Sequence, residues 1–416
     1  MRIFKFGGTS VKDAEGVKNL VKVLKHEGYN NTLVVISAMG KMTNAFEKVI
    51  QAYIEKDTEL DQHISDIKLY HIQIINDLFT DKNHPVLFEL EHIFGLLKGF
   101  MLANRSTNYN FIYDQLVGFG EMLSTKIISH YLNKAGITNQ WLDVRQLIVT
   151  SDDFREATVN WEETQHRICN AIDKDKLYIT QGFLGATKDN FTTTLGREGS
   201  DFTAAIFAYC LKAKSVCIWK DVTGVLNADP RVFSKTELLQ QISYKEAIEM
   251  AFYGASVIHP KTLKPLENCG IPLYVRSFKE LQSKGTIVKK GEDIIPRIPC
   301  FVIKKDQIFL QISALDFSFM VEHNISNLFK LLVKHKLRVN LIQNSALSFR
   351  VCIEDKYNNF EAFITKIKKN YRAEYFQNVT LFTIRHYTEE AINTIEKDKE
   401  ILLKQLSENT IQFIVK

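Results

Sequence analysis

The first 36 residues, MRIFKFGGTSVKDAEGVKNLVKVLKHEGYNNTLVVI, decide the fold class of this chain. An apolar run at Arg2–Phe6 is broken by Gly7-Gly8, and apolar residues then recur with a helical period over Val11–Lys25. A second apolar run follows at Thr32–Ile36. A strand, a glycine turn, a helix and a strand make a βαβ unit, which predicts an α/β fold on a mainly parallel sheet.

The pattern outside this unit extends the same fold. From residue 44 to about 116, apolar residues recur at i, i+3 and i+4, which predicts a block of helices beside the sheet. Further strands are expected at Ile137–Leu142, Leu177–Thr180 and Ser215–Trp219, with a hairpin around 185–194 and a helix at Phe202–Leu211. Gly, Lys and Pro gather at 283–299, so we expect a first domain over 1–290 and a second over 291–416.

The residues after 300 predict an α+β domain of the ferredoxin-like kind. The expected elements are a strand at Gln307–Leu315, a helix at Asn327–Lys336, strands at Val339–Asn344 and Leu347–Glu354, a helix at Asn359–Asn370, a strand at Val379–Arg385, one long helix over Thr388–Leu406 and a strand at Thr410–Val415. The residues after Asn370 leave too few elements for a complete second unit of this kind.

The composition excludes several classes of protein. Hydrophobic residues make up 45% and charged residues 24% of the chain, so it can bury a core and is not disordered. The net charge is +5 with interspersed charges, which gives no reason to expect nucleic acid or a membrane surface as a partner. No signal segment or window of ~18 apolar residues occurs, and the six cysteines lack zinc spacing. We therefore expect a cytoplasmic protein without a metal site of its own.

Three glycine-containing clusters carry candidate chemistry. The first is Lys5-Phe6-Gly7-Gly8-Thr9-Ser10, in which a lysine ends a strand and two glycines let backbone N–H groups approach phosphate oxygens at a helix start. The alternative is an ordinary strand-to-helix turn with a hydroxyl cap. Gly40-Lys41-Met42-Thr43 and Gly118-Phe119-Gly120 each lack a glycine that a P-loop or a dinucleotide fingerprint needs.

The second and third clusters add charged side chains. Within residues 194–204, Arg197 is suited to clamp a carboxylate and Asp201 to hold a lysine or a substrate ammonium, although Ser and Asp also favour a simple helix start. The third cluster, from Trp219 to Arg231, follows an apolar strand. Ligands of open α/β sheets bind at the carboxyl ends of strands, but a surface turn is the alternative for this segment.

Together the clusters resemble the aspartate kinases of the amino acid kinase family. The matching motifs are KFGGTSV at 5–11, the turn at 37–43, GEMLST at 120–125, QGFLG at 181–185, LGREGSDFTA at 195–204, WKDVTGVLNADPR at 219–231 and YGASVIHPKTL at 253–263. The resemblance implies a three-layer αβα sandwich followed by an ACT-like regulatory and dimerisation domain, and a homodimer formed through that domain.

The resemblance also implies the roles of individual residues. Lys5 would neutralise charge on the transferred phosphoryl group, and Asp201 would organise Lys5. ATP, carrying Mg²⁺, would be held by Lys5, Phe6, Gly7, Gly8, Ser10, Lys220, Asp221, Leu226, Arg231 and Ser256. Aspartate would be held by Ser37, Thr43, Glu121, Phe183, Arg197, Glu198, Gly199 and Ser200, with Glu121 on its ammonium and Arg197 on its α-carboxylate.

The implied reaction is transfer of the γ-phosphoryl group of ATP to the side-chain carboxylate of L-aspartate, giving 4-phospho-L-aspartate on the route to lysine, threonine and methionine. A sister carboxylate kinase acting on glutamate and a non-catalytic amino-acid sensor are the alternatives.

Three residues depart from the family pattern: Glu198 replaces a glycine, Leu226 a tyrosine and Ser256 a lysine. Loss of that lysine weakens ATP binding unless another cation such as Lys261 substitutes. A glycine turn before the first regulatory helix is replaced by residues 321–326, so we expect weak feedback inhibition.

Overall fold

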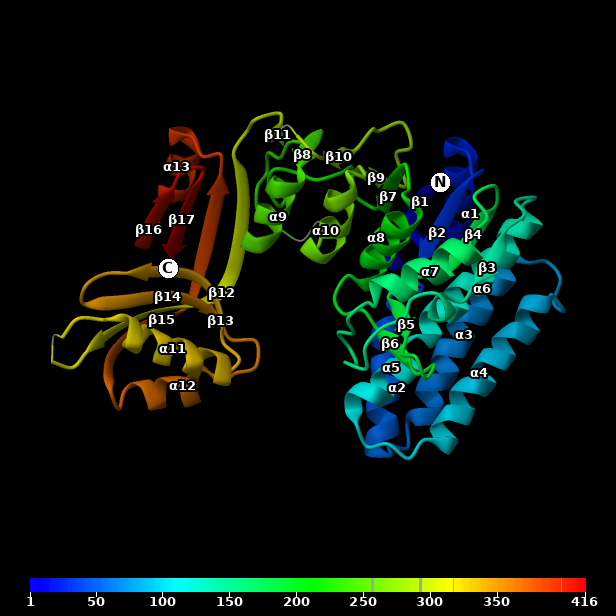
Figure 1. The fold of residues 1–416 in the computed structure, drawn as a ribbon, viewed down its shortest axis with the longest axis horizontal. Helices are drawn as coiled ribbons and strands as arrows, with labels where there is room; N and C mark the ends of the chain where they lie inside the picture. Colours follow the sequence, from blue (N-terminus) through cyan, green and yellow to red (C-terminus); the bar gives the residue numbers. More distant parts are fainter. Residues whose placement is uncertain (256–257, 292–293, 317, 398) are drawn as a thin grey trace. The chain divides into compact units, whose positions relative to one another are not determined.

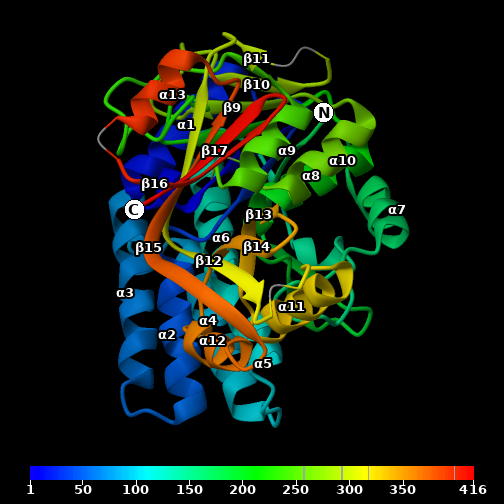
Figure 2. The same cartoon turned by 90° about the vertical axis from the view of Figure 1, so that its left-hand side faces the viewer.

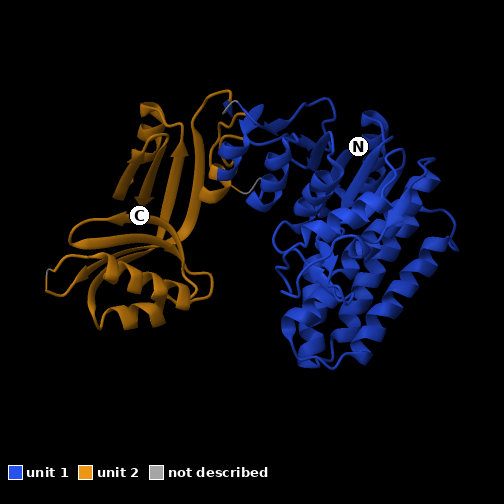
Figure 3. Ribbon diagram, in the orientation of Figure 1, with its two compact units in different colours: residues 1–225, 238–248, 257–294 blue, residues 226–237, 249–256, 295–416 orange. Residues whose placement is uncertain are grey.

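The computed structural model describes residues 1–255, 258–291, 294–316, 318–397 and 399–416. These residues form two compact units (Figure 3). Unit 1 comprises Met1–Val225, Leu238–Ile248 and Val257–Ile294, and unit 2 comprises Leu226–Glu237, Glu249–Ser256 and Ile295–Lys416. Unit 2 therefore takes two short segments from the earlier part of the chain in addition to its C-terminal part. The functional division into domains at 1–290 and 291–416 stays a prediction.

A nine-stranded sheet forms the centre of unit 1. Its strand order is β11-β8-β10-β9-β7-β1-β2-β4-β3. The central strands are β1 (Arg2–Phe6), β2 (Thr32–Ile36), β4 (Leu177–Gln181) and β7 (Ser215–Lys220), and the others are β3 (Gln140–Leu142), β8 (Gln241–Ser243), β9 (Leu273–Ser277), β10 (Thr286–Lys289) and β11 (Ile294–Ile295). The pairs β1–β2, β1–β7, β2–β4, β3–β4, β7–β9 and β8–β10 are parallel, and β9–β10 is antiparallel. The predicted mainly parallel sheet is therefore confirmed.

The alternation of side chains along β1 separates the two faces of the sheet. Phe4 and Phe6 join the large apolar core that contains residues of α1 (Ala14–Glu27) and α6 (Phe119–Lys134). Lys5 points to the other face, where α8 (Gly199–Leu211) packs against β1, β2 and β7. Helices α7 (Trp161–Ala171) and α10 (Pro260–Cys269) pack beside α8 (Figure 1). Helices thus cover both faces of the sheet, and the three-layer αβα expectation is confirmed.

A block of helices packs beside this sandwich, as the periodicity of residues 44–116 predicts. It consists of α2 (Met42–Glu55), α3 (Leu60–Leu78), α4 (Pro85–Ala103) and α5 (Tyr109–Val117), which run side by side in Figure 2. Pro85 begins α4, and the Asn108 side chain accepts hydrogen bonds from the first N–H groups of α5, so local chemistry sets both helix starts. Short elements complete unit 1: η1 (Gly8–Val11), η2 (Val144–Gln146), and the hairpin β5 (Leu184–Ala186) and β6 (Thr192–Thr194). Helix α9 (Tyr244–Tyr253) begins in unit 1 and ends in unit 2.

Unit 2 is built on a six-stranded antiparallel sheet of order β13-β14-β12-β15-β17-β16. Its longest strands, β12 (Cys300–Ala314) and β15 (Tyr371–Arg385), serve both halves of the sheet. In one half, β13 (Arg338–Asn344), β14 (Ser348–Glu354), α11 (Glu322–Lys334) and α12 (Phe360–Ile367) complete a βαββαβ order around a common apolar core. The other half contains α13 (Glu389–Glu396), β16 (Ile401–Ser407) and β17 (Thr410–Val415). The expected ACT-like, ferredoxin-like class is confirmed for the sheet-rich C-terminal part.

One predicted element is wrong. The single long helix expected over Thr388–Leu406 is two elements, because α13 ends at Glu396 and Ile401–Ser407 is strand β16. Apolar residues in this segment fit a helical period and an alternating strand equally well. Pairing with β17 decides for the strand, with Ser407 opposite Thr410 and Leu403 buried. Strands β12 and β15 also begin earlier than predicted, because they pair with each other along nearly their whole length, from Cys300 opposite Arg385 to Ala314 opposite Tyr371.

Candidate active site

Three charged side chains meet on the α8 face of the sheet. The Lys5 ammonium nitrogen lies 2.7 Å from Oδ1 of Asp201, and the Lys220 nitrogen lies 3.8 Å from Oδ2 of the same carboxylate. Lys5 comes from β1, Lys220 from the end of the neighbouring strand β7, and Asp201 from the first turn of α8. Burial alone would raise the pKa of Asp201, but the two ammonium groups outweigh it and lower that pKa. Asp201 is therefore a carboxylate shared by two cations.

The glycine loop after β1 packs against the loop after β2. A Cβ on Gly8 would lie 2.6 Å from the Ala38 carbonyl oxygen and 2.8 Å from the Gly40 carbonyl oxygen, so only glycine fits there. The Gly40 N–H donates to the Gly8 carbonyl at 3.0 Å. The Ser10 hydroxyl donates to the Trp219 carbonyl at 3.3 Å, which ties the loop to β7. Two loops at the carboxyl ends of adjacent strands thus form one backbone surface beside Lys5.

Glu121 is a buried carboxyl group with unused hydrogen-bonding capacity. It lies in the first turn of α6 with 2% of its surface exposed. Its Oε1 accepts a 3.3 Å hydrogen bond from the Ala38 N–H, and among the described residues its Oε2 has no partner. Burial raises the pKa of Glu121 to about 8, although Lys5 and two backbone N–H groups act in the opposite direction. Buried polar atoms are normally hydrogen-bonded, so this oxygen is available to a donor on a ligand.

The segment before α8 approaches the loop after β4 closely. A Cβ on Gly182 would lie 2.4 Å from Cβ of Ser200, and a Cβ on Gly199 would lie 2.7 Å from the Phe183 ring. Phe183 has a φ of 71°, a left-handed conformation that is rare for a bulky side chain, and Thr203 accepts its N–H at 2.9 Å. Strained backbone concentrates at functional sites, so this approach agrees with the substrate role expected for Phe183.

Glu198, which departs from the family pattern, caps α8 in a left-handed conformation with a φ of 54°. Glycine adopts this conformation without steric cost. Among the described residues, the buried Oε2 of Glu198 has no hydrogen-bond partner. The Lys261 ammonium nitrogen is near the preceding loop, 3.7 Å from the position that a Cβ on Gly196 would take. A cation is therefore close to the substrate loop, while the substitution of Lys261 for a lysine at position 256 in ATP binding stays a prediction.

The remaining predicted substrate residues surround these groups. Ser37 is half-buried at the end of β2, and its carbonyl accepts the Ser124 hydroxyl at 2.8 Å. Thr43 is half-buried in the first turn of α2. Arg197 is exposed, and within the part of the chain that the structure describes it has no ion-pair partner. An unpaired guanidinium beside the glycine segment is available for a carboxylate.

The residues after β7 that we expect to bind ATP are divided between the two units. Asp221 follows Lys220 and is exposed. Leu226 and Arg231 belong to unit 2, where Arg231 is held by Asp229 at 2.7 Å, so their contribution to ATP binding stays a prediction. Ser256 lies outside the described residues.

Two supporting residues carry no sequence signal. Asp114, fully buried in α5, accepts the Thr194 N–H and hydroxyl at 2.8 Å each and the Arg155 N–H at 2.9 Å, and burial raises its pKa to about 6. It therefore anchors the strand that leads into the Arg197 loop. The Tyr70 hydroxyl of α3 donates to the Lys12 carbonyl and lies beside Gly40. In the sequence, a single polar residue within a helical pattern looks the same whether it is buried or faces solvent, so neither Asp114 nor Tyr70 could be identified from it.

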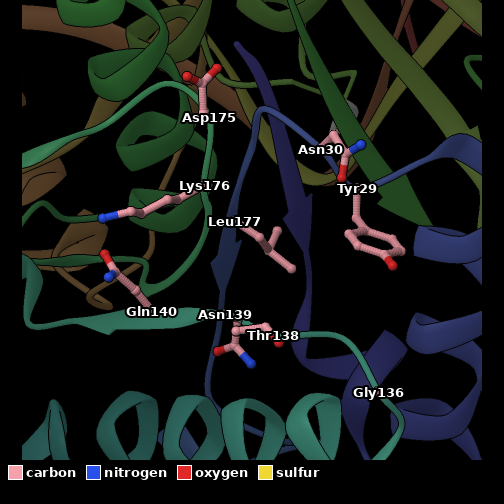
Figure 4. A pocket seen from close by; sticks show the side chains of 9 residues that line it. All are labelled: Tyr29, Asn30, Gly136, Thr138, Asn139, Gln140, Asp175, Lys176 and Leu177. Carbon is pink, nitrogen blue, oxygen red and sulfur yellow. The ribbon is translucent and has the colours of Figure 1, made fainter.

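A separate pocket lies at the other end of the strands, where β2, β3 and β4 begin. It has a volume of about 380 Å³ and is lined by residues at the amino ends of β2, β3 and β4, among them Asn30, Gln140 and Leu177 (Figure 4). Lys5, Ser37 and Lys220 are at the carboxyl ends of the same sheet, so this pocket is not part of the charged site. Ligands of parallel α/β sheets bind at the carboxyl edge, and we assign the site to the Lys5 cluster on that physical ground.

In the described ranges, no group of three or more His, Cys, Asp or Glu side chains could hold a metal ion. Among the helices made of described residues, none has the length and apolarity that crossing a membrane requires.

Comparisons with known proteins agree with this geometry. A family model described as "Amino acid kinase family" matches residues 1–277. The chain is 33% identical to the chloroplastic aspartokinase 1 of Arabidopsis thaliana over 75% of this chain and 56% of that protein. It is 31% identical to the lysine-sensitive aspartokinase 3 of Escherichia coli (strain K12) over 85% of this chain and 78% of that protein. The chain thus spans little more than half of the Arabidopsis protein.

A solved structure shares the whole fold. The structure of E. coli aspartokinase III in complex with aspartate and ADP has a TM-score of 0.81 and 26% identity, covering 100% of this chain and 96% of that chain. With the family match over residues 1–277 and 31% identity across most of the E. coli protein, the chain belongs to the amino acid kinase family and, within it, to the aspartokinases.

Proposed function

We propose that this protein is an ATP-dependent aspartate kinase, which transfers the γ-phosphoryl group of ATP to the side-chain carboxylate of L-aspartate. One observation carries the proposal: Lys5 and Lys220 share the single carboxylate of Asp201 beside the glycine loop, while Glu121 is buried with one oxygen that has no partner among the described residues. The ion cluster has one positive charge in excess, which suits phosphate oxygens. The orphaned carboxyl suits the ammonium group of an amino acid.

The chemistry requires positioning and charge neutralisation. The side-chain carboxylate of aspartate has an ordinary pKa of about 3.9, so it is ionised at neutral pH and needs no general base. One of its oxygens forms the new bond to the γ-phosphorus, and the bond from that phosphorus to the bridging oxygen breaks. The electron pair leaves with ADP, and no proton is transferred. Negative charge spreads over the equatorial oxygens of the phosphoryl group, where Lys5 stabilises it.

Asp201 acts on Lys5 rather than on the substrate. Its carboxylate holds the Lys5 ammonium at 2.7 Å on the α8 face, so the cation is oriented before the nucleotide arrives. The N-terminus of α8 adds the partial positive charge of a helix dipole on the same side. The glycine loop at Gly7-Gly8 offers backbone N–H groups to the phosphates. Mg²⁺ would arrive with ATP, because it keeps water ligands and binds phosphate oxygens in such sites.

The amino acid would be held at both ends. Glu121 would receive the substrate ammonium, and the unpaired Arg197 would clamp the α-carboxylate bidentately. Phe183, Ser200 and the close approach of Gly199 would shape the space between them. Structures of a relative support this proposal, since E. coli aspartokinase III has been solved with aspartate and ADP. A product that feeds lysine, threonine and methionine synthesis, a cytoplasmic location and a homodimer formed through the ACT-like domain belong to the same proposal.

An ATP-dependent hydroxamate assay tests the function. Hydroxylamine traps an acyl phosphate, so we expect product with aspartate and ATP and background signal with glutamate or without an amino acid. Signal with glutamate instead of aspartate would identify the sister carboxylate kinase. Background signal in all samples from a folded protein that still binds ATP would favour the non-catalytic sensor and contradict the proposal.

A further inference from the structure

Helix α4 carries exposed apolar side chains on its outer face. Its inner face, including Ile93, Phe94 and Leu97, is buried in the core of unit 1. On its outer side, Phe88 is 72% exposed and Leu102 is 80% exposed. A surface helix normally presents polar residues to solvent, so large apolar groups on both faces indicate a second packing partner.

The outer residues form a regular seam. Positions 88, 92, 95, 99 and 102 alternate in steps of four and three, the spacing that keeps side chains along one line between two packed helices. Phe88, His92, Gly95, Gly99 and Leu102 occupy them. An added Cβ would meet no atom within 4 Å at Gly95 or Gly99, so the centre of the seam is open to the close approach of another backbone.

The seam is self-complementary when it is reversed about Gly95. Residue 88 is seven positions before Gly95 and residue 102 is seven positions after it, so a two-fold axis at Gly95 places Phe88 opposite Leu102 of a second copy. Glu91 and Lys98 lie on one flank of the seam, and the midpoint between them falls next to Gly95. Reversal therefore places Glu91 opposite Lys98 of the second copy and Lys98 opposite its Glu91.

The charges on this flank favour association between copies. Among the described residues, Glu91 is paired only with Lys68, at 2.6 Å on the exposed surface, and a carboxylate can accept a second cation. Among the described residues, Lys98 has no ion-pair partner. The two reciprocal pairs of opposite charge that an antiparallel arrangement creates reinforce each other.

We propose that α4 is a self-association surface, on which a second copy of this chain packs its own α4 antiparallel about Gly95. Apolar contact between Phe88 and Leu102 of the second copy supplies the driving force, and the reciprocal Glu91–Lys98 pairs select the antiparallel register. This surface lies in unit 1. It is separate from Lys5, Asp201 and Glu121, so it requires nothing of the proposed catalysis.

Charge exchange in the 416-residue protein tests the surface. We expect Glu91→Lys and Lys98→Glu each to raise the dissociation constant of the contact about tenfold, because each places like charges together. The double variant Glu91→Lys/Lys98→Glu should return to within about threefold of the wild type. Lys68→Ala, the matched control, removes only the intrachain partner of Glu91 and should leave association unchanged. Sedimentation velocity over a concentration series measures each constant.

A cross-link provides a second measurement that does not depend on the strength of association. Gly95→Cys, made with the exposed Cys169 and Cys269 changed to serine, should form a disulfide between two copies under mild oxidation, whereas Lys82→Cys on the same background should not. The proposal is overturned if the charge variants associate like the wild type, or if folded Gly95→Cys protein stays uncross-linked. A wild-type protein that shows no association attributable to α4, or a double variant that fails to recover, also overturns it.

Discussion

The Lys5 ammonium lies 2.7 Å from the Asp201 carboxylate, and both side chains are buried. Lys5 is next to the last residue of β1, which is bordered by β2 and β7, while Asp201 lies in the first turn of the helix that covers them. A buried cation is costly unless it is paired, so Asp201 stabilises the very charge that the phosphates need. This pair connects the stability of the sheet centre with the proposed transfer of a phosphoryl group.

Replacement of Lys5 should remove turnover while keeping the fold. Because Lys5 is only 8% exposed, Lys5→Met is the suitable variant, since it keeps the length of the side chain without its charge. We expect kcat to fall by a factor of about 10² to 10³, the loss typical of one electrostatic contact to a transition state. Circular dichroism checks the fold and steady-state rates check the activity. A variant that keeps more than about a tenth of wild-type kcat would contradict the role of Lys5.

Glu121→Gln should weaken the use of aspartate much more than the use of ATP. The substitution keeps the shape and removes the negative charge that faces the substrate ammonium. Separate KM values for the two substrates measure the effect, and we expect that of aspartate to rise about tenfold or more. Arg197→Lys should act in the same direction, because it removes the planar fork that matches a carboxylate. An equal rise for both substrates would indicate distortion of the fold instead.

The pH dependence of stability should report the burial of Glu121. Its folded-state pKa of about 8 is above the ordinary value of 4.5, so between these values the folded state holds a proton that the unfolded state has lost. The unfolding free energy contributed by this group therefore falls as pH rises from about 4.5 to 8. We expect the Tm of the substrate-free wild type to drop relative to Glu121→Gln over this range. Parallel Tm profiles for the two proteins would rule out a protonated Glu121.

Glu198→Gly should lower the KM for the anionic substrates by several-fold. The change removes a carboxylate beside the substrate loop and places glycine where φ is 54°. Glu198→Gln removes the charge but keeps the left-handed side chain, so comparing the two variants separates electrostatics from backbone conformation. Both variants should act alike if charge is the cause. If neither variant changes KM, the Glu198 carboxylate does not face the substrates.

Feedback inhibition should be weak. Helix α11 begins at Glu322 after Val321, which provides no side-chain cap, and residues 321–326 contain no glycine that would let an effector approach the backbone. We expect initial rates to stay within about a factor of two with lysine, threonine or both at millimolar concentration, near the upper end of common KM values. The E. coli relative is named as lysine-sensitive, so it is a suitable positive control. Half-inhibition at ~1 mM effector would contradict this expectation.

Much of the fold could be predicted because it depends on short-range order. The alternation in Arg2–Phe6 and the helical period of residues 44–116 are properties of neighbouring residues, and β1 and α2–α5 formed as expected. The segment at 401–407 could not be predicted in the same way. Its apolar residues fit two periods, and only pairing with β17 made it a strand. Local pattern is insufficient wherever a distant partner chooses between two allowed conformations.

The sequence by itself determined the class of the fold, the glycine loop and the identity of the charged residues, because these follow from residue type and spacing. Only the tertiary structure decided that Lys5 and Lys220 share Asp201, that Glu121 is buried with an oxygen unpaired among the described residues, and that Asp114 anchors the strand before Arg197. These relationships join segments that are far apart along the chain. Burial and Coulomb interactions depend on distances in space, and packing of the sheet and its helices sets those distances.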